Sequence, residues 1–318
     1  MRLDRDQQKR VGEALREDLG KVIAHWLEEP TCEDIVLNQD GRLLVKCLGR
    51  DWEYVGNMDA AAAESVITSI AALRGITLPH DRPILETVIP FNGSRFEGIL
   101  LPASDPPVFS IRKRSSVVYT LDDYVRNGIA TQAEAIRLKR AIQEHKTILF
   151  SGSTGSGKTT LLKGAMCELP EDERVVVIEE TPELQCNLKN AVFLLAHEPH
   201  ASLSHLLAAT LRMRPSRIIV GEVRGAEALV MLKAFNTGHP GGLSTVHAND
   251  PLAALLRINS LVREAIPSYD ATDLIYEAIQ MVVQIDGPRL GARRHISQIL
   301  DIDELSKREF HRSAASGA

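Results

Sequence analysis

The residues with the most definite chemistry lie between positions 152 and 159, where the sequence reads GSTGSGKT. An apolar run, TILF, precedes this stretch, and apolar residues at helical spacing follow it. Glycines let the backbone approach a phosphate closely, while the loop N–H groups and the helix N-terminus face the anion. Lys158 adds a mobile charge for the outer phosphates, and the Thr159 hydroxyl is a hard oxygen ligand for Mg²⁺. A strand, a glycine-rich loop and a helix in this order predict a nucleoside triphosphate site made of Gly152, Ser153, Thr154, Gly155, Ser156, Gly157, Lys158, Thr159 and Thr160.

Two acidic stretches follow apolar strands further along the chain. Glu179, Glu180 and Glu183 follow the run VVVI, and Glu222 follows IIVG. At the carboxyl ends of strands these side chains would lie beside the nucleotide, where phosphoryl transfer needs groups that orient the metal ion and the attacking water. The alternative for Glu180 and Glu183 is that they are solvated acids at the start of a helix.

Two histidines lie in a glycine-rich segment that follows the acidic strands, GHPGGLSTVHAND at 238–250. A metal site would require a cysteine or carboxylate cluster, which this segment does not have. His247 follows the apolar residues of an expected strand, and there its ring can donate a hydrogen bond. We therefore expect His247 to contact the γ-phosphate.

The first 118 residues mix helical and strand patterns. Apolar residues spaced by three or four predict an amphipathic helix over 3–28, and an alanine-rich stretch predicts another over 59–74. The polar face of the first helix carries both signs, which favours packing on its own domain over a membrane surface. QDG at 39–41 and NG at 92–93 are hairpin signals. This predicts an α+β domain, residues 1–118, with strands 34–38, 43–46, 84–90, 94–100 and 108–114.

From residue 132 the pattern changes to short apolar strands alternating with helices, which is typical of a parallel sheet covered on both faces. We expect residues 119–131 to be a linker, 132–145 to be a helix, and 313–318 to be a frayed tail. The second domain, residues 132–318, is therefore predicted to be an α/β P-loop domain. Its expected strands are 147–151, 174–179, 192–196, 217–221, 242–246, 282–286 and 296–300, and its expected helices include 202–213 and 226–236.

Composition argues against several classes of function. The net charge of −5 and the pI of about 6.1 do not favour bulk nucleic-acid binding. The four cysteines form no CxxC pair, so zinc and redox motifs are not expected. We expect the protein to be in a reducing compartment. The first residues of the sequence are heavily charged, so we expect no signal peptide, and no uncharged apolar run approaches the ~18 residues of a membrane span. We expect a cytoplasmic protein.

Four motifs occur in order along the chain: GSTGSGKT, IEETPE, GEVRG and STVHAN. They resemble the Walker A, Asp-box, Walker B and His-box motifs of the type II/IV secretion and traffic ATPases, and the resemblance covers most of the chain. LRMRP at 211–215, GSRF at 93–96 and SIRK at 110–113 resemble the same family. One departure is Glu180, which has the longer side chain where the family box usually has Asp.

The resemblance implies an N-terminal α+β domain joined to a RecA-like ATPase domain, with six chains in a ring. It implies ATP as the nucleotide and Mg²⁺ as the metal ion. The catalytic candidates on the second domain are Glu179, Glu180, Glu222 and His247. Among these, Glu222 would hold Mg²⁺ together with Thr159.

Two arginines of the first domain, Arg95 and Arg112, are expected to act on the γ-phosphate. The motive is partly the resemblance and partly chemistry, because a planar guanidinium suits the charge that spreads over three oxygens in the transition state. The choice among Arg112, Lys113 and Arg114 is open. The alternative is that these arginines pair with surface carboxylates, which contribute little.

The resemblance further implies a motor that powers a conjugative type IV secretion system. Its partners would be inner-membrane components, and it would associate peripherally, through them, with the cytoplasmic face of the inner membrane. One alternative is a pilus or type II secretion motor, and another is a nucleotide-gated scaffold with little turnover. A nucleic-acid translocase is disfavoured by the acidic pI and the lack of an aromatic and basic stripe, so no direct nucleic-acid binding is expected.

Overall fold

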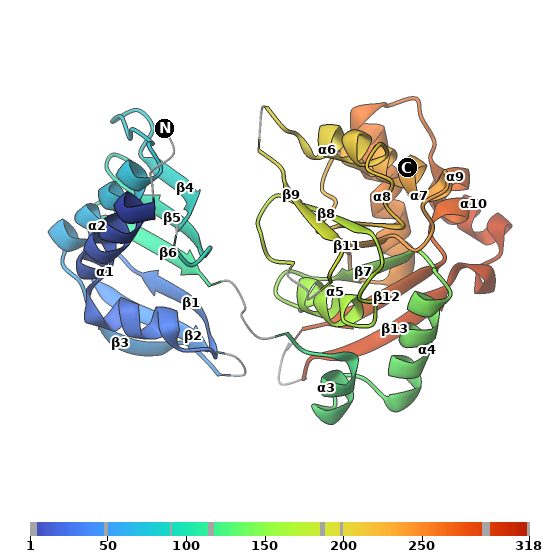
Figure 1. Ribbon diagram of the computed structural model, residues 1–318, viewed down its shortest axis with the longest axis horizontal. Coiled ribbons are helices and arrows are strands. Elements are labelled where there is room, and N and C mark those ends of the chain that lie inside the picture. The colour runs from blue at the N-terminus through green and yellow to red at the C-terminus, as the bar shows by residue number, and fades with distance from the viewer. Residues whose placement is uncertain are drawn as a thin grey trace. The chain divides into compact units, whose positions relative to one another are not determined.

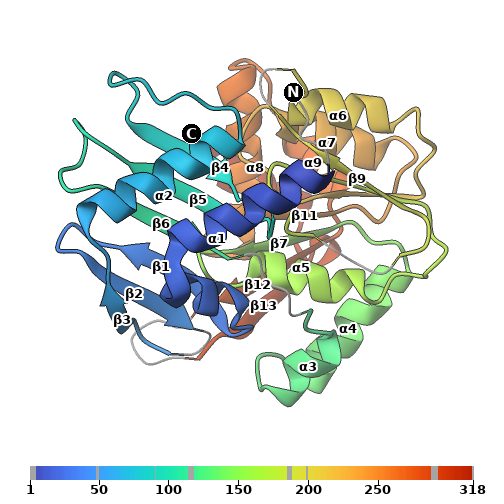
Figure 2. The ribbon, with the colours of Figure 1, turned by 60° about the vertical axis from the view of Figure 1, so that its left-hand side comes forward.

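The computed structural model describes residues 5–47, 50–89, 91–113, 118–184, 188–197, 200–287 and 293–316. The chain divides into two compact units, Met1–Val117 and Val118–Ala318, each with its own sheet and its own buried core (Figures 1 and 2). None of the helices among the described residues has the length and apolar character that crossing a bilayer requires.

The first unit is built on a six-stranded antiparallel sheet. Its strands are β1 (Cys32–Leu37), β2 (Arg42–Cys47), β3 (Glu53–Asn57), β4 (Ile84–Val88), β5 (Arg95–Ile99) and β6 (Val108–Arg112). They lie in the order β3-β2-β1-β6-β5-β4. The turns after β1 and β4 contain Gly41 and Gly93, with φ angles of 77° and 72°. Glycine adopts this left-handed conformation without steric cost, so both expected hairpins form where their turn signals lie. Pro90, the last residue of one expected strand, lies outside the described residues.

Two helices, α1 (Arg5–Glu28) and α2 (Ala60–Leu73), cover one face of this sheet (Figures 1 and 2). Side chains alternate between the two faces of a strand. Ile35 and Ile111 point towards the helices and are fully buried, together with Ile67 of α2. The other face of the sheet carries no helix among the described residues, so no helix of this unit buries its polar side chains.

The second unit contains a seven-stranded sheet. Its strands are β7 (Ile148–Gly152), β8 (Val175–Glu179), β9 (Ala191–Leu195), β10 (Arg217–Val220), β11 (Leu243–His247), β12 (Met281–Asp286) and β13 (His295–Asp301). The spatial order is β13-β12-β7-β11-β10-β8-β9, and every neighbouring pair except β12–β13 is parallel. Because the strands are parallel, the carboxyl ends of β7, β11, β10 and β8 lie along one edge of the sheet.

Helices cover both faces of this second sheet (Figure 1). One face carries α3 (Leu121–Arg126), α4 (Gln132–Gln143) and α5 (Lys158–Met166). The other carries α6 (Leu203–Thr210), α7 (Glu227–Asn236), α8 (Pro251–Ala265), α9 (Thr272–Ala278) and α10 (Lys307–Ser316). The fold class expected from the sequence, an N-terminal α+β domain followed by an α/β P-loop domain, is therefore confirmed.

Two segments differ from the sequence-based expectation. Residues 119–131, expected to connect the domains, contain α3, and Leu121 and Tyr124 of this helix are buried in the core of the second unit. Apolar side chains at these two positions make the segment part of that unit. A frayed tail was expected over 313–318. For residues 313–316 this was wrong, because they belong to α10, which ends at Ser316. Phe310 anchors this helix, because it is fully buried in the core.

A buried charge fixes the amino-terminal edge of the second sheet. Arg217, the first residue of β10, donates from Nε to Oε1 of Glu173 at 3.1 Å and from Nη1 to the carbonyl oxygen of Gly241 at 2.6 Å. The exposed fractions of the Arg217 and Glu173 side chains are only 1% and 6%. Burial lowers the pKa of Arg217, and the Glu173 carboxylate opposes that shift. This ion pair lies at the edge opposite to the carboxyl ends of the strands.

Candidate nucleotide site

The glycine-rich sequence connects β7 to α5 at the carboxyl edge of the second sheet. Gly155 and Gly157 have φ angles of 75° and 99°, and Gly157 is the N-cap of α5. A Cβ atom at Gly152 would lie 2.3 Å from the carbonyl oxygen of Ile285 and 2.5 Å from Oγ of Ser156. The loop geometry therefore requires glycine at these three positions. Backbone N–H groups at the start of a helix, next to a loop without side chains, fit a phosphate group.

Two donors in this loop converge on one oxygen. Lys158 Nζ donates to the carbonyl oxygen of Ser153 at 3.0 Å, and the N–H of Ser156 donates to the same oxygen at 3.2 Å. Lys158 is only 6% exposed. Cationic and N–H donors that meet at one acceptor are the arrangement that a phosphate oxygen needs.

Three threonines accompany these donors. Thr159 and Thr160 are partly buried in the first turn of α5, and Thr154 is exposed in the loop before it. A hydroxyl oxygen is the type of hard ligand that Mg²⁺ takes. Thr159 is therefore suited to the metal role expected from the sequence, and that role stays a prediction.

The strand order places the histidine and the two acidic motifs beside the loop. His247 ends β11 and is the register partner of Gly152 at the end of β7. Glu222 follows β10, and β10 pairs with the edge of β11 that faces away from β7. Glu179 ends β8, the next strand along. Motifs that are far apart in the sequence thus lie on consecutive strands at one edge.

Lys158, His247 and Glu222 are in direct contact. Lys158 Nζ lies 3.1 Å from Nδ1 of His247, and His247 Nε2 lies 2.7 Å from Oε1 of Glu222. An ammonium can only donate, so Nδ1 is the acceptor and the proton of the neutral ring sits on Nε2, the nitrogen that lies beside the carboxylate. Partial burial lowers the pKa of His247, the Lys158 charge lowers it further, and Glu222 opposes the shift. Burial and the lysine charge thus both favour the neutral imidazole that the contact with Lys158 requires.

Arg224 extends this chain of charges on the far side of Glu222. Its Nη2 donates to Oε2 of Glu222 at 2.6 Å, and its Nη1 lies 3.8 Å from Oε2 of Glu180. The hydrogen bond to Glu222 raises the pKa of the guanidinium. The structure thus brings Lys158, His247, Glu222 and Glu180 into one line of contacts, with Arg224 as a member that the sequence analysis did not single out.

Glu179 has a different environment. It is 6% exposed, and its Oε2 accepts the backbone N–H groups of Glu183 and Leu184, both at 2.9 Å. A Cβ at Gly221 would lie 3.0 Å from Cβ of Glu179, so the glycine before Glu222 makes room for it. This carboxylate therefore holds the turn after β8 in place beside the Walker B strand.

The two expected arginines of the first unit face each other across neighbouring strands. Arg95 of β5 and Arg112 of β6 are direct register partners. Arg112 is also the partner of Asp34 on β1, with its Nε 3.7 Å from Oδ1, and Asp34 is the partner of Lys46 on β2. Like charges directly opposite each other are unfavourable, and Asp34 offsets part of this repulsion. Lys46 Nζ also lies 3.8 Å from Oδ1 of Asp51. The contact of this row with nucleotide stays a prediction.

The structure narrows the choice among the three basic residues at the end of β6. Lys113 Nζ donates to the carbonyl oxygen of Trp26 at 3.0 Å and also to that of Glu29. These oxygens belong to the carboxyl end of α1 and to the residue after it, where a cation is favourable. Burial lowers the pKa of Lys113. Arg114 lies outside the described residues, so Arg112 is the better candidate of the two described here.

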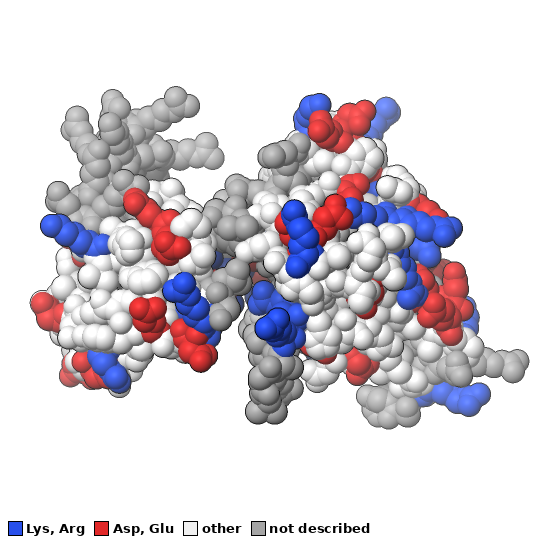
Figure 3. All heavy atoms as spheres, turned by 90° about the horizontal axis from the view of Figure 1, so that it is seen from below, with Lys and Arg blue, Asp and Glu red and all other residues white. Residues whose placement is uncertain are grey.

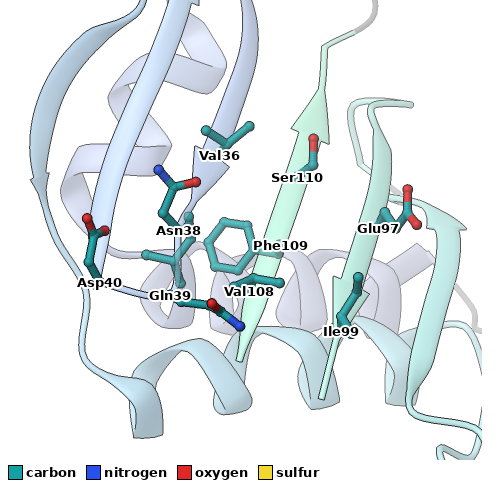
Figure 4. Close-up of a pocket in the computed structure, with 10 residues that line it drawn as sticks. Val36, Asn38, Gln39, Asp40, Glu97, Ile99, Val108, Phe109 and Ser110 are labelled. Carbon is teal, nitrogen blue, oxygen red and sulfur yellow. The ribbon is translucent and has the colours of Figure 1, made fainter. Parts of the chain in front are cut away.

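An open hollow of about 700 Å³ lies on the same face of the first sheet as this row. Figure 4 shows Asn38, Glu97 and Ser110 among the side chains around it. Glu97 and Ser110 are two residues from Arg95 and Arg112 on the same strands, so they share the arginines' face of the sheet. The residues that line the hollow include no Lys or Arg, which makes it unsuited to phosphates.

Charges of both signs are interspersed over the face that Figure 3 shows. The structure also contains pairs of opposite charges, such as Lys139 with Asp122 at 2.8 Å and Arg140 with Glu144 at 2.7 Å. On this face the described residues present no continuous basic field of the kind that nucleic-acid backbones need.

Comparison with known proteins settles the family. The model of the family described as "Type II/IV secretion system protein" matches residues 73–289. The chain belongs to this family. It is 41% identical to the conjugal transfer protein TrbB of Rhizobium radiobacter over 92% of this chain and 91% of the relative. These findings confirm the resemblance that the four ordered motifs indicated.

Solved structures of this family have the same fold. The crystal structure of the Brucella suis VirB11 ATPase in complex with sulphate is 28% identical, has a TM-score of 0.51, and covers 96% of this chain and 99% of its own. The Legionella pneumophila ATPase DotB is 20% identical with a TM-score of 0.64, covering 100% of this chain and 88% of its own, and it shows the fold alone. Both of these similar proteins are described as ATPases.

Sequence reasoning within this family missed two residues beside the site. Arg224 lies inside the quoted motif GEVRG, and its position two residues after Glu222 was the available signal. Arg294 lies beyond every motif, just before β13, and no local pattern marks it. Its contact with the phosphate loop becomes visible only in the folded chain.

Proposed function

We propose that this chain is a Mg²⁺-dependent ATPase that works as a homo-hexameric motor and powers a conjugative type IV secretion system. The observation that carries the proposal is the contact of Lys158, His247 and Glu222 beside a glycine loop that fits a phosphate. The 41% identity to a conjugal transfer protein supports conjugation. The VirB11 relative was solved with sulphate, an anion shaped like phosphate, which supports an anion site in this fold.

In this proposal the residues of the second domain divide the work of hydrolysis. The Ser156 N–H and the Lys158 ammonium now donate to the carbonyl oxygen of Ser153. When nucleotide binds, its phosphate oxygens replace that carbonyl oxygen as the acceptor. Thr159 and Glu222 would hold Mg²⁺, whose positive charge would offset the negative charge of the phosphate oxygens. Glu222 orients the attacking water as its second role. Phosphoryl transfer needs such positioning more than covalent help.

We expect His247 to contact the γ-phosphate once Lys158 has moved to the phosphates. When Lys158 moves to the phosphates, Nδ1 of His247 loses the donor that it accepts from in this structure. That nitrogen can then take up a proton and donate a hydrogen bond to a phosphate oxygen. The same ring contacts Glu222 through Nε2. A change in the protonation of the ring when the γ-phosphate binds would therefore act directly on the Glu222 carboxylate.

The remaining candidates support this centre. Glu179 holds the turn after β8, and Glu180 shares Arg224 with Glu222. Arg95 and Arg112 act on the nucleotide from the first domain, residues 1–118, while the domain of residues 132–318 binds it. Closure of one domain on the other would then couple hydrolysis to motion. The motor would act at the cytoplasmic face of the inner membrane, bound peripherally to inner-membrane components of the secretion system.

Phosphate release and mass in solution together test the proposal. We expect steady phosphate release that needs both ATP and Mg²⁺, from an assembly of six copies of the 35.0 kDa chain. Tight ATP binding without phosphate release would support the nucleotide-gated scaffold. Release stimulated by DNA, with binding that weakens as salt rises, would support the translocase.

A second experiment separates conjugation from a pilus or type II secretion motor, which would use the same chemistry. The gene for this chain is deleted from a conjugative host and replaced by the wild-type gene or by a Lys158→Ala variant. We expect the wild type to restore DNA transfer and the variant to fail. Normal transfer in the deletion strain would contradict the conjugative role and leave the ATPase chemistry standing.

A further inference from the structure

Arg294 comes from a part of the chain remote in sequence from the phosphate loop. It directly precedes β13, which pairs with β12, and β12 lies beside β7, the strand that leads into the loop. The end of β12 already touches the loop. A Cβ at Gly287 would lie 3.1 Å from Cα of Ser156, and the carbonyl of Ile285 is next to Gly152. The β12–β13 hairpin therefore forms one wall of the candidate nucleotide site.

The guanidinium of Arg294 lies directly against the loop. Its Nη2 donates to the carbonyl oxygen of Gly155 at 3.2 Å. A Cβ at Gly157 would lie only 3.2 Å from Nε and 3.4 Å from Cζ of the same arginine. Gly157 is the N-cap of α5, so a full positive charge sits at the helix end where the phosphates are expected. Among the described residues, Nε–H of Arg294 is buried without an acceptor.

The bond to Gly155 has a consequence for the next amide. In a trans peptide the C=O and the following N–H point in opposite directions. By holding the carbonyl of Gly155, Arg294 also fixes the direction of the Ser156 N–H, which donates to the Ser153 oxygen that Lys158 contacts. The arginine thus turns a loop amide towards the point where the phosphate donors converge.

We infer that Arg294 is a positioning residue of the phosphate loop. It holds the Gly155–Ser156 peptide in the orientation that receives phosphate, and its charge adds to the affinity for the anion. The inference rests on the proposed function only in taking nucleoside phosphates as the ligand. It assigns no role to Arg294 in the chemical step.

The test compares Arg294→Ala with Arg293→Ala, a matched control that removes the same charge from the exposed neighbouring residue. Binding of a fluorescent ADP is measured by anisotropy, and ATP turnover gives KM and kcat. Arg294 holds the loop peptide with a charged donor, so we expect Arg294→Ala to raise both Kd and KM about tenfold, ~1.4 kcal/mol. We expect kcat at saturating ATP to change by less than about twofold, since the residue acts before chemistry. Arg293→Ala should match the wild type.

Equal Kd values for Arg294→Ala and Arg293→Ala would overturn the inference, and so would a loss of kcat at unchanged KM. If Arg294→Ala does not fold, Arg294→Gln replaces it, because the amide keeps a donor and loses the charge. For that variant we expect a rise in Kd of about threefold, ~0.65 kcal/mol, and an unchanged Kd would count against us. A wild-type protein that binds ADP without turnover would defeat the proposed hydrolysis while leaving Arg294 testable through Kd. A wild type that binds no nucleotide would defeat both.

Discussion

Lys158 Nζ, at the start of α5, and His247 Nδ1, at the end of β11, lie 3.1 Å apart. The lysine of the phosphate loop is therefore held by a neutral imidazole and by the Ser153 carbonyl. A nucleotide must break this contact to engage the lysine. The same histidine contacts Glu222, so one ring joins the residue that is expected to bind phosphate to the residue that is expected to activate water.

Replacing Lys158 with Ala should abolish ATP turnover and leave the fold intact. The side chain contacts the loop carbonyl and His247, and it is absent from both hydrophobic clusters of this unit. A charge-assisted contact is worth roughly 1.5–3 kcal/mol in binding, and more in the transition state. Phosphate release and the thermal midpoint are measured side by side, with Lys189→Ala, an exposed lysine, as the control. Near-normal release from folded Lys158→Ala would remove the phosphate-loop assignment.

His247 should titrate below the ordinary range of histidine. Burial and the Lys158 ammonium both favour the neutral ring, so its proton is taken up only at a lower pH than for a free side chain. NMR titration of the ring protons gives its pKa, and the His247→Asn spectrum identifies its signal among the 10 histidines. In Lys158→Ala the pKa should rise, because the nearby positive charge is gone. A pKa above about 6.5 in the wild type is incompatible with the contact described here.

Much of this site could be predicted because its parts are local sequence features. The glycines of the phosphate loop, the turn glycines Gly41 and Gly93, and the acids at strand ends each depend on a few adjacent residues. The line of contacts from Lys158 to Glu180 could not be predicted from such features. It depends on β11 and β10 lying between β7 and β8, an order that differs from the order along the chain.

The misses have physical causes as well. Segment 119–131 has the polar and glycine content of a linker, yet two apolar side chains, Leu121 and Tyr124, are enough to bury it. The start of α8 had a clear signal that was passed over, since Asp250 accepts the N–H of Ala253 at 2.8 Å and Pro251 opens the helix. Arg294 had no signal, because its partner is a backbone carbonyl far away in sequence.

Arg112 and Lys113 are adjacent but should respond differently to substitution. Arg112→Ala removes one member of the cationic row with Arg95 and should lower kcat by about 10³-fold or more if it acts as an arginine finger. Lys113→Ala leaves two carbonyls at the end of α1 without their cation, so it should lower the thermal midpoint instead. Both variants are assayed for turnover and for melting. A drop of less than threefold in turnover for Arg112→Ala would exclude the arginine-finger role and leave Arg112 as a residue that pairs with surface carboxylates.

Glu173→Ala should destabilise the protein without affecting the nucleotide site. It leaves Arg217 as a buried charge with its ion pair removed, and breaking a buried pair typically costs ~3–5 kcal/mol. The pair lies at the opposite edge of the sheet, so protein that remains folded should bind nucleotide with unchanged Kd. Urea unfolding and ADP binding measure the two effects. A weakened Kd at unchanged stability would show that the two edges are not separable.

Glu222→Gln tests the central claim most directly, because the amide has nearly the shape of the carboxylate and none of its charge. Bound nucleotide and phosphate release are measured on the same samples, with Glu264→Gln, a matched change at an exposed ion pair with Arg257, as the control. We predict that Glu222→Gln retains ATP and loses about 10²–10⁴-fold in turnover, the range for a lost general base, while Glu264→Gln keeps the wild-type rate. Unchanged turnover per bound ATP in a folded Glu222→Gln protein would contradict the account.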